Sequence, residues 1–168
     1  MQYPNEHKKI VSNLLDGKFI ISSHLFNVIK EQEDDYIEFF KKSYGFDLKV
    51  EADFAYLSSD DVKETRTRDF VLFLAVLCRE LDYSGKNFRD TVELGSLDIS
   101  ETFELLKQSS KWEILEKTTV ADFEKFITTW TGKNLLMKTG SQFKFTKAVI
   151  VFLSFAVNIA NAKIKEEN

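Results

Sequence analysis

The 168-residue sequence has little of what interrupts regular structure, with one proline and only six glycines. This scarcity favours helices over a loop-rich fold. Cysteine is almost absent as well: the single Cys78 cannot form an internal disulfide, which fits a reducing compartment. Because Cys78 lies in the apolar run 70–78, we expect it to be a small buried hydrophobic residue.

Long apolar runs are also missing. The longest strongly apolar stretch, 148–157, has ten residues, whereas a helix that spans a bilayer needs roughly 20. The first ten residues, MQYPNEHKKI, are polar and lack the pattern of a secretory signal. We therefore expect a cytoplasmic protein with no membrane partner, in which 148–157 belongs to a buried helix.

Patterns typical of catalytic or metal-binding sites are absent too. The two histidines, His7 and His24, have no cysteine or second histidine at ligand spacing, and His7 is expected at the surface. The glycines are isolated from one another, which excludes a phosphate-binding loop. The acidic clusters at 31–35 and 58–61 are interpreted as solvated faces rather than cation sites. The sequence thus predicts no enzyme activity, no metal and no cofactor.

Phenylalanine, by contrast, is abundant, with sixteen residues that can build a sizeable core. The apolar pattern divides the chain into two units, and the first has the order helix, short strand, helix, helix, hairpin. This is the order of a winged helix, so we expect a mostly α fold with small β-hairpins (α+β), built from tandem winged-helix domains. The expected boundaries are a first domain at 1–58, a linker at 59–65 and a second domain with a C-terminal helix at 66–168.

In the first unit, Gly17 is expected to end the first helix and Ser23 to cap the second. Alternation of apolar and polar residues predicts a hairpin that turns at 51–53. The expected elements are helices at 6–15, after Ser23 and at 34–44, a strand at 18–21 and a hairpin at 46–57.

In the second unit, a looser segment is expected at 83–96, around two glycines. Gly132 is expected to end the helix that takes the place of a recognition helix. The hairpin is expected to turn at 139–141. The expected elements are helices at 66–82, 98–109, 119–131 and 146–164 and a hairpin at 135–146.

Charge is distributed unevenly along the chain. Residues 1–124 hold 16 basic and 25 acidic residues, a formal charge of −9, whereas residues 125–168 carry +5. A basic wing can lie along DNA phosphates, although lysines also keep an exposed hairpin edge soluble. The candidates for a weak, non-specific DNA contact are Lys133, Lys138, Lys144 and Lys147.

The first unit is not expected to read DNA. Asp34, Asp35 and Glu38 on its third helix would meet phosphate repulsion, so this unit is better suited to protein contacts. Aromatic residues in or near less regular segments offer a second kind of candidate, because aromatic side chains are enriched in protein interfaces. These interface candidates are Phe88, Trp112 and Trp130, and the alternative for all three is an ordinary place in the core.

Four stretches carry a resemblance to a known family. They are LLDGKFI (14–20), HLFNVI (24–29), YIEFFKKSYGFDLKVEADFAYL (36–57) and FITTWTGKNLLMKTGSQFKFTKAVIVF (126–152). In their order of apolar residues, glycines and turns they resemble MukE and the related MksE, small subunits of bacterial condensins, and the small winged-helix subunit of the Wadjet plasmid-defence system.

The resemblance implies a tandem winged-helix subunit without an ATPase site of its own. It also implies binding to a kleisin (MukF/MksF-like), pairing into a homodimer, and assembly with an SMC ATPase (MukB/MksB-like) on the nucleoid, for chromosome organisation and segregation. Two alternatives stay open. One is the small subunit of a Wadjet-type defence complex, and the other is a stand-alone winged-helix transcription regulator, which would recognise DNA sequence without a partner.

Overall fold

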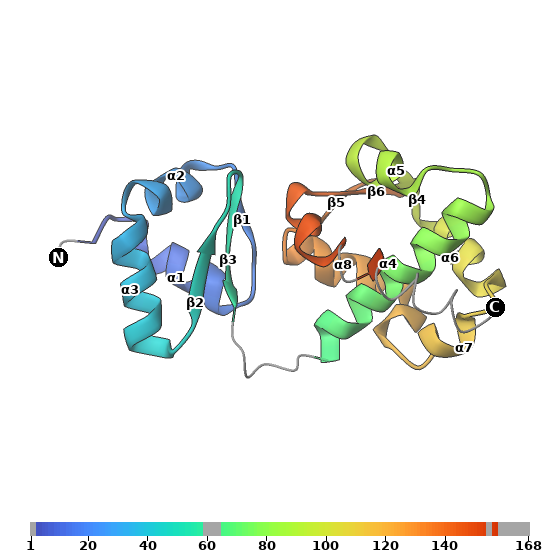
Figure 1. Ribbon diagram of the computed structural model, residues 1–168, viewed down its shortest axis with the longest axis horizontal. Helices are drawn as coiled ribbons and strands as arrows, with labels where there is room; N and C mark the ends of the chain where they lie inside the picture. Colours follow the sequence, from blue (N-terminus) through green and yellow to red (C-terminus); the bar gives the residue numbers. More distant parts are fainter. Residues whose placement is uncertain (1–2, 59–64, 154–155, 158–168) are drawn as a thin grey trace.

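The computed structural model describes residues 3–58, 65–153 and 156–157, arranged as two modules (Figure 1). In each module helices pack around a small three-stranded antiparallel sheet, which confirms the expected α+β class and the tandem winged-helix order. The first module consists of α1 (His7–Leu15), β1 (Ile20–Ile21), α2 (His24–Glu31), α3 (Glu33–Tyr44), β2 (Asp47–Val50) and β3 (Phe54–Ser58).

The helices of the first module begin and end at the expected signals. Gly17, just beyond α1, has a φ of 72°, a left-handed conformation that glycine adopts without strain. Ser23 caps α2, because its side chain accepts a hydrogen bond from the backbone N–H of Phe26. Helix α3 has three acidic residues in its first turn, where they complement the helix dipole.

Strand β3 lies in the middle of the first sheet, whose order is β1-β3-β2. The register pairs Ile20 with Ala55 and Leu48 with Leu57. Strands β1 and β2 are therefore the two edges of this sheet. The module has its own cluster of buried residues, formed by Ile10, Leu14, Ile20, Phe26, Val28, Ile29, Tyr36, Phe40, Leu48 and Ala55.

The second module is larger and more helical. Its sheet has the order β4-β6-β5, with the hairpin strands paired so that Met137 lies opposite Lys144. Its elements are α4 (Thr65–Tyr83), α5 (Phe88–Leu94), β4 (Leu97–Asp98), α6 (Ile99–Gln108), α7 (Trp112–Leu115), η1 (Thr119–Ala121), α8 (Phe123–Gly132), β5 (Leu136–Thr139), β6 (Gln142–Phe145) and η2 (Lys147–Val149).

The segment 83–96, which was expected to be irregular, contains the helix α5. Asn87 caps it by accepting hydrogen bonds from the backbone N–H groups of Arg89 and Asp90. Phe88 and Val92 are its buried residues. A helix this short shows too few apolar positions for a helical period to be recognised, so the expectation was wrong at this point.

The end of α8 also differs from the expectation. The helix runs through Gly132, and the left-handed residue is Asn134, with a φ of 65°. Asparagine is one of the few residues besides glycine that adopt this conformation readily. Helix α8 also starts later than expected. The side chain of Asp122 caps it by accepting a hydrogen bond from the backbone N–H of Lys125, and the preceding residues form the separate turn η1.

The closing segment begins as η2 and continues with helical residues 150–153 and 156–157. The remainder of the helix expected at 146–164 lies outside the described residues, as does 59–64 of the expected linker. Among the residues that the structure describes, none of the helices combines the length and the apolar character that a membrane span requires.

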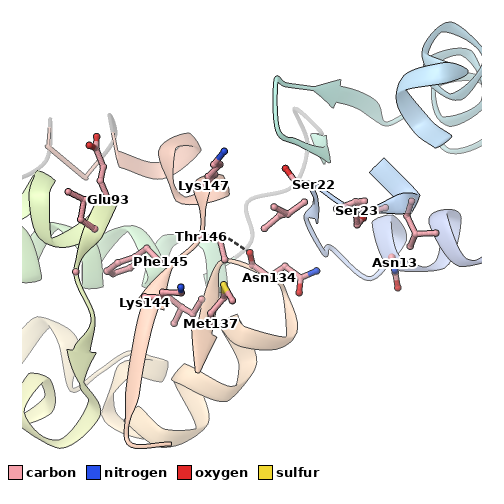
Figure 2. Close-up of a pocket in the computed structure, with 16 residues that line it drawn as sticks. Asn13, Ser22, Ser23, Glu93, Asn134, Met137, Lys144, Phe145, Thr146 and Lys147 are labelled. Atoms are coloured by element: carbon pink, nitrogen blue, oxygen red, sulfur yellow. Dashed lines mark hydrogen bonds between the residues drawn. The ribbon is translucent and has the colours of Figure 1, made fainter. Parts of the chain in front are cut away.

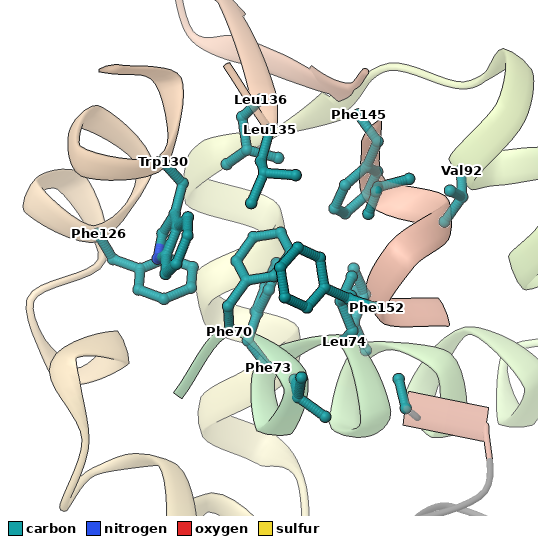
Figure 3. Packing of buried hydrophobic residues seen from close by; sticks show 14 of the residues in the cluster. Phe70, Phe73, Leu74, Val92, Phe126, Trp130, Leu135, Leu136, Phe145 and Phe152 are labelled. Atoms are coloured by element: carbon teal, nitrogen blue, oxygen red, sulfur yellow. The ribbon is translucent and has the colours of Figure 1, made fainter. Parts of the chain in front are cut away.

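Helix α4 forms the centre of the second core. Phe70, Phe73 and Leu74 project from it and are fully buried. Figure 3 shows them facing Phe126 and Trp130 of α8, the start of the hairpin and the closing segment. The ring centroids of Phe70 and Trp130 are 4.5 Å apart, and those of Phe73 and Phe126 are 5.0 Å apart. Much of the phenylalanine content therefore goes into one aromatic core.

The two modules are joined by ring packing and hydrogen bonds that no pattern in the sequence predicts. Phe19 and Phe54 of the first module belong to the buried cluster of the second, and the ring centroids of Phe19 and Phe152 are 6.0 Å apart. The backbone N–H of Phe19 donates to the carbonyl oxygen of Lys133 at 3.0 Å. The side-chain amide of Asn134 donates to the carbonyl oxygen of Phe19 at 2.8 Å. The division into domains 1–58 and 66–168 stays a prediction, because part of the core is shared.

Candidate partner-binding grooves

A groove of about 720 Å³ opens between β1 with the start of α2 and the β5–β6 hairpin (Figure 2). We call it the hairpin groove. Its apolar wall is unusually exposed for such residues, since Leu94 is 88% and Met137 50% accessible. It is lined by Asn13, Ile20, Ile21, Ser22, Ser23, Leu25, Glu93, Leu94, Gly95, Asn134, Leu136, Met137, Lys144, Phe145, Thr146 and Lys147.

A second groove, of about 780 Å³, lies between the turn of the first hairpin and the closing segment. We call it the turn groove. Ile150 on its wall is 63% exposed. It is lined by Glu51, Ala52, Asp53, Phe54, Tyr56, Val92, Glu93, Phe145, Thr146, Lys147, Val149, Ile150, Val151 and Leu153.

The two grooves are neighbours along the seam between the modules. Glu93, Phe145, Thr146 and Lys147 line both of them. The ammonium of Lys147 lies 3.1 Å from a carboxylate oxygen of Asp53, in the first hairpin, so an ion pair crosses the seam. Both partners are substantially exposed, so this pair contributes little to stability and can exchange partners.

The four candidate DNA-contacting lysines do not form one strip. The register pairs Lys138 with Phe143 and Lys144 with Met137, which puts the two lysines on opposite faces of the hairpin. Lys138 faces α8, where its ammonium lies 3.2 Å from Glu124. Lys144 instead lines the hairpin groove (Figure 2).

The other two lysines contact the first module. The ammonium of Lys133 donates a hydrogen bond to the carbonyl oxygen of Asp16, beyond the end of α1. Lys147 forms the ion pair with Asp53 already described. Three of the four candidates thus lie at or beside the seam, and only Lys138 lies on the other face of the hairpin.

The aromatic interface candidates are placed mainly in the core. Phe88 and Trp130 are 6% and 7% exposed. Trp112 is half-buried, with its ring centroid 5.7 Å from that of Phe103. The exposed apolar residues Leu94 and Met137 of the hairpin groove were not among the candidates that the sequence predicted. Strand alternation around Met137 could have indicated an outward-facing apolar residue in β5.

The polar groups that could support chemistry are held in structural contacts. His7 is partly buried rather than exposed: its ring stacks on Tyr3 at 3.8 Å, and burial lowers the pKa of its imidazole. A hydrogen bond with His24 at 3.0 Å lowers the pKa of the Glu6 carboxyl.

Cys78 is buried, as expected, and the loss of hydration there raises the pKa of its thiol to about 11, which makes it a poor nucleophile. Within the described residues, no three histidine, cysteine or acidic side chains gather as metal ligands would.

Comparisons with known proteins identify the family. The family model described as "Condensin complex protein MksE" matches residues 5–157. No curated protein matches the sequence. Among solved structures, a chain of an "Nse1-Nse3-Nse4 complex" shares 11% identity, with a TM-score of 0.42 over 90% of this chain and 72% of that chain. Because the family model covers nearly the whole chain, the protein belongs to the MksE family of condensin complex proteins.

Proposed function

We propose that this condensin subunit is a non-catalytic adaptor that holds an extended segment of the kleisin (MukF/MksF-like). It thereby joins the kleisin to the SMC ATPase (MukB/MksB-like) for chromosome organisation at the nucleoid. The observation that supports this most directly is the apolar wall of the hairpin groove, where Leu94 and Met137 are exposed. Extended peptides bind such sites through a strand edge and through apolar side chains in pockets.

Strand β1 offers the edge that this mode of binding needs. It is the outer strand of its sheet, and it borders the hairpin groove. Ser22 donates its backbone N–H to Asp53 at 2.8 Å, so the backbone of Ser22 faces the neighbouring strand. Antiparallel alternation then turns the backbone N–H and C=O of Ile21 to the opposite, unpaired side. These groups can bond a partner backbone laid along the groove.

A substitution in the groove tests the proposal. Met137→Asp should weaken kleisin binding by at least about tenfold, because it sets a charge against an apolar contact. The measurement is a calorimetric titration with the purified kleisin of the same condensin complex. Tyr83→Asp is the matched control, since Tyr83 is 69% exposed and lines neither groove. Wild-type affinity in Met137→Asp would contradict the groove as the kleisin site.

The proposed homodimer is supported by a self-complementary face on α1. Val11 and exposed Leu15 form an apolar stripe, beside a shallow depression that Lys8 and Asp16 also line. If two copies of α1 pack antiparallel around Ser12, Lys8 of each lies against Asp16 of the other. In such an isologous contact, both copies use the same surface patch.

The solution mass tests this pairing. Leu15→Asp should convert a dimer to a monomer in light scattering, because it would bury a charged group in the apolar stripe that the two copies share. Ile150→Asp is the control, since Ile150 lies away from α1 in the turn groove and is exposed as well. A Leu15→Asp variant that stays dimeric would exclude this face.

Lys138 is our candidate for the weak, non-specific DNA contact of the assembled complex. It lines neither groove, and a phosphate can replace its exposed partner Glu124. Lys138→Glu should weaken DNA binding equally for different sequences and reduce the slope of log K against log salt by roughly 0.9.

Fluorescence anisotropy of the assembled complex on two unrelated duplexes, across a salt series, measures both effects. Lys86→Glu is the control, because Lys86 is exposed and lines neither groove, so this variant should leave the slope unchanged. An unchanged slope in Lys138→Glu would show that this lysine only solubilises the hairpin. Strong sequence preference by the subunit alone would favour a transcription regulator instead.

A further inference from the structure

The charged residues of the two grooves are arranged in a definite order along the seam. Glu93 and Lys147 line both grooves, so their charges are common to the whole path. The remaining charged residues differ between the grooves. The hairpin groove contains Lys144, whereas the turn groove contains Glu51 and Asp53. One end of the path is therefore basic and the other acidic.

Apolar residues accompany this change of sign. Exposed Leu94 and Met137 lie at the basic end, and exposed Ile150 lies at the acidic end. Phe145, which is buried, lines both grooves between them. A bound chain would thus meet apolar contacts on both sides of the point where the charge reverses.

The ion pair between Lys147 and Asp53 lies at that point. Its partners are 3.1 Å apart, with side chains 67% and 45% exposed. An exposed pair contributes only about 0–1 kcal/mol. A basic residue of a bound partner can therefore replace Lys147 beside Asp53 at little cost.

We propose that the kleisin segment runs through both grooves as one extended chain with a fixed charge order. An acidic residue faces Lys144, apolar residues cover the centre, and a basic residue faces Glu51 and Asp53. This inference rests on the proposed function and specifies the chemistry of the partner. Reversal of the charge order would put like charges together at both ends, which is costly and enforces one binding direction.

A random peptide library displayed on phage tests the charge order without assuming a partner sequence. The library displays peptides of about 16 residues, which extend over roughly 50 Å when fully stretched. The wild-type protein should enrich peptides with an acid toward one end and a base toward the other, separated by apolar residues. A synthetic copy of an enriched peptide should bind at least about tenfold more tightly than its charge-swapped version.

Two charge variants make the test specific. Lys144→Glu should select peptides that are basic at both ends, and the double variant Glu51→Lys, Asp53→Lys should select peptides that are acidic at both ends. Lys86→Glu is the control, because Lys86 is exposed and lines neither groove. Circular dichroism of each variant establishes that it is folded.

The outcomes separate this inference from the function on which it rests. Enriched peptides without a charge order, or an order that the two variants leave unchanged, would overturn the bipolar path. Calorimetric kleisin binding that survives such a result would leave the adaptor function intact. If no peptide is enriched and kleisin is not bound, both proposals fail together.

Discussion

Alanine in place of Phe19 should lower the free energy of unfolding by about 3 kcal/mol and separate the unfolding of the two modules. Phe19 is in the first module, yet its ring packs against Phe54, Tyr56 and Phe152, and it is 7% exposed. Its removal leaves a cavity where the two modules share a core. The neighbouring hydrogen bonds to Lys133 and Asn134 involve only the backbone of Phe19, so they do not compensate for the lost packing.

Calorimetry and hydrogen exchange together can measure this effect. The wild type should unfold in one transition, whereas Phe19→Ala should show two, with the first module exchanging its amides earlier. Phe40→Ala is the matched control, since Phe40 is fully buried in the first module's own cluster. It should destabilise that module to a similar extent without a specific loss of coupling. A single transition in Phe19→Ala would show that the modules depend on other contacts.

The second large effect is expected at Asp69, a carboxylate on α4 that is only 2% exposed. One of its oxygens accepts two hydrogen bonds from Thr119, from the backbone N–H at 3.0 Å and from the hydroxyl at 2.9 Å. These bonds fasten η1 to the central helix. Asp69→Ala should cost about 2 kcal/mol, because both donors of Thr119 lose their partner in a buried place.

Denaturant unfolding of two variants separates hydrogen bonding from charge at this site. Asp69→Asn keeps an oxygen that can accept both bonds, so it should cost less than Asp69→Ala. Glu116→Ala, at an exposed position, should change stability by no more than about 0.5 kcal/mol. Equal losses in Asp69→Asn and Asp69→Ala would mean that the charge, rather than the accepted hydrogen bonds, stabilises this contact.

The length of the turn between β5 and β6 decides on which face of the hairpin each lysine lies. The sequence predicted a three-residue turn at 139–141, which would pair position 138 with 142 and put Lys138 and Lys144 on one face. The structure pairs Thr139 with Gln142 across a two-residue turn. A shift of one residue moves side chains to the other face of a strand. Lys144 consequently lines a groove, and Lys138 does not.

By itself, the sequence determined the local features. These are two units in the same order, the end of α1 before Gly17, the start of α2 after Ser23, and an apolar central helix around Phe70. These follow from interactions between residues close in the chain, such as caps and apolar periodicity. Only the tertiary structure decided the features of the seam. Phe19 in the second core and the pairing of Lys147 with Asp53 join residues more than ninety positions apart. No local pattern specifies such contacts, because they depend on how two folded surfaces fit together.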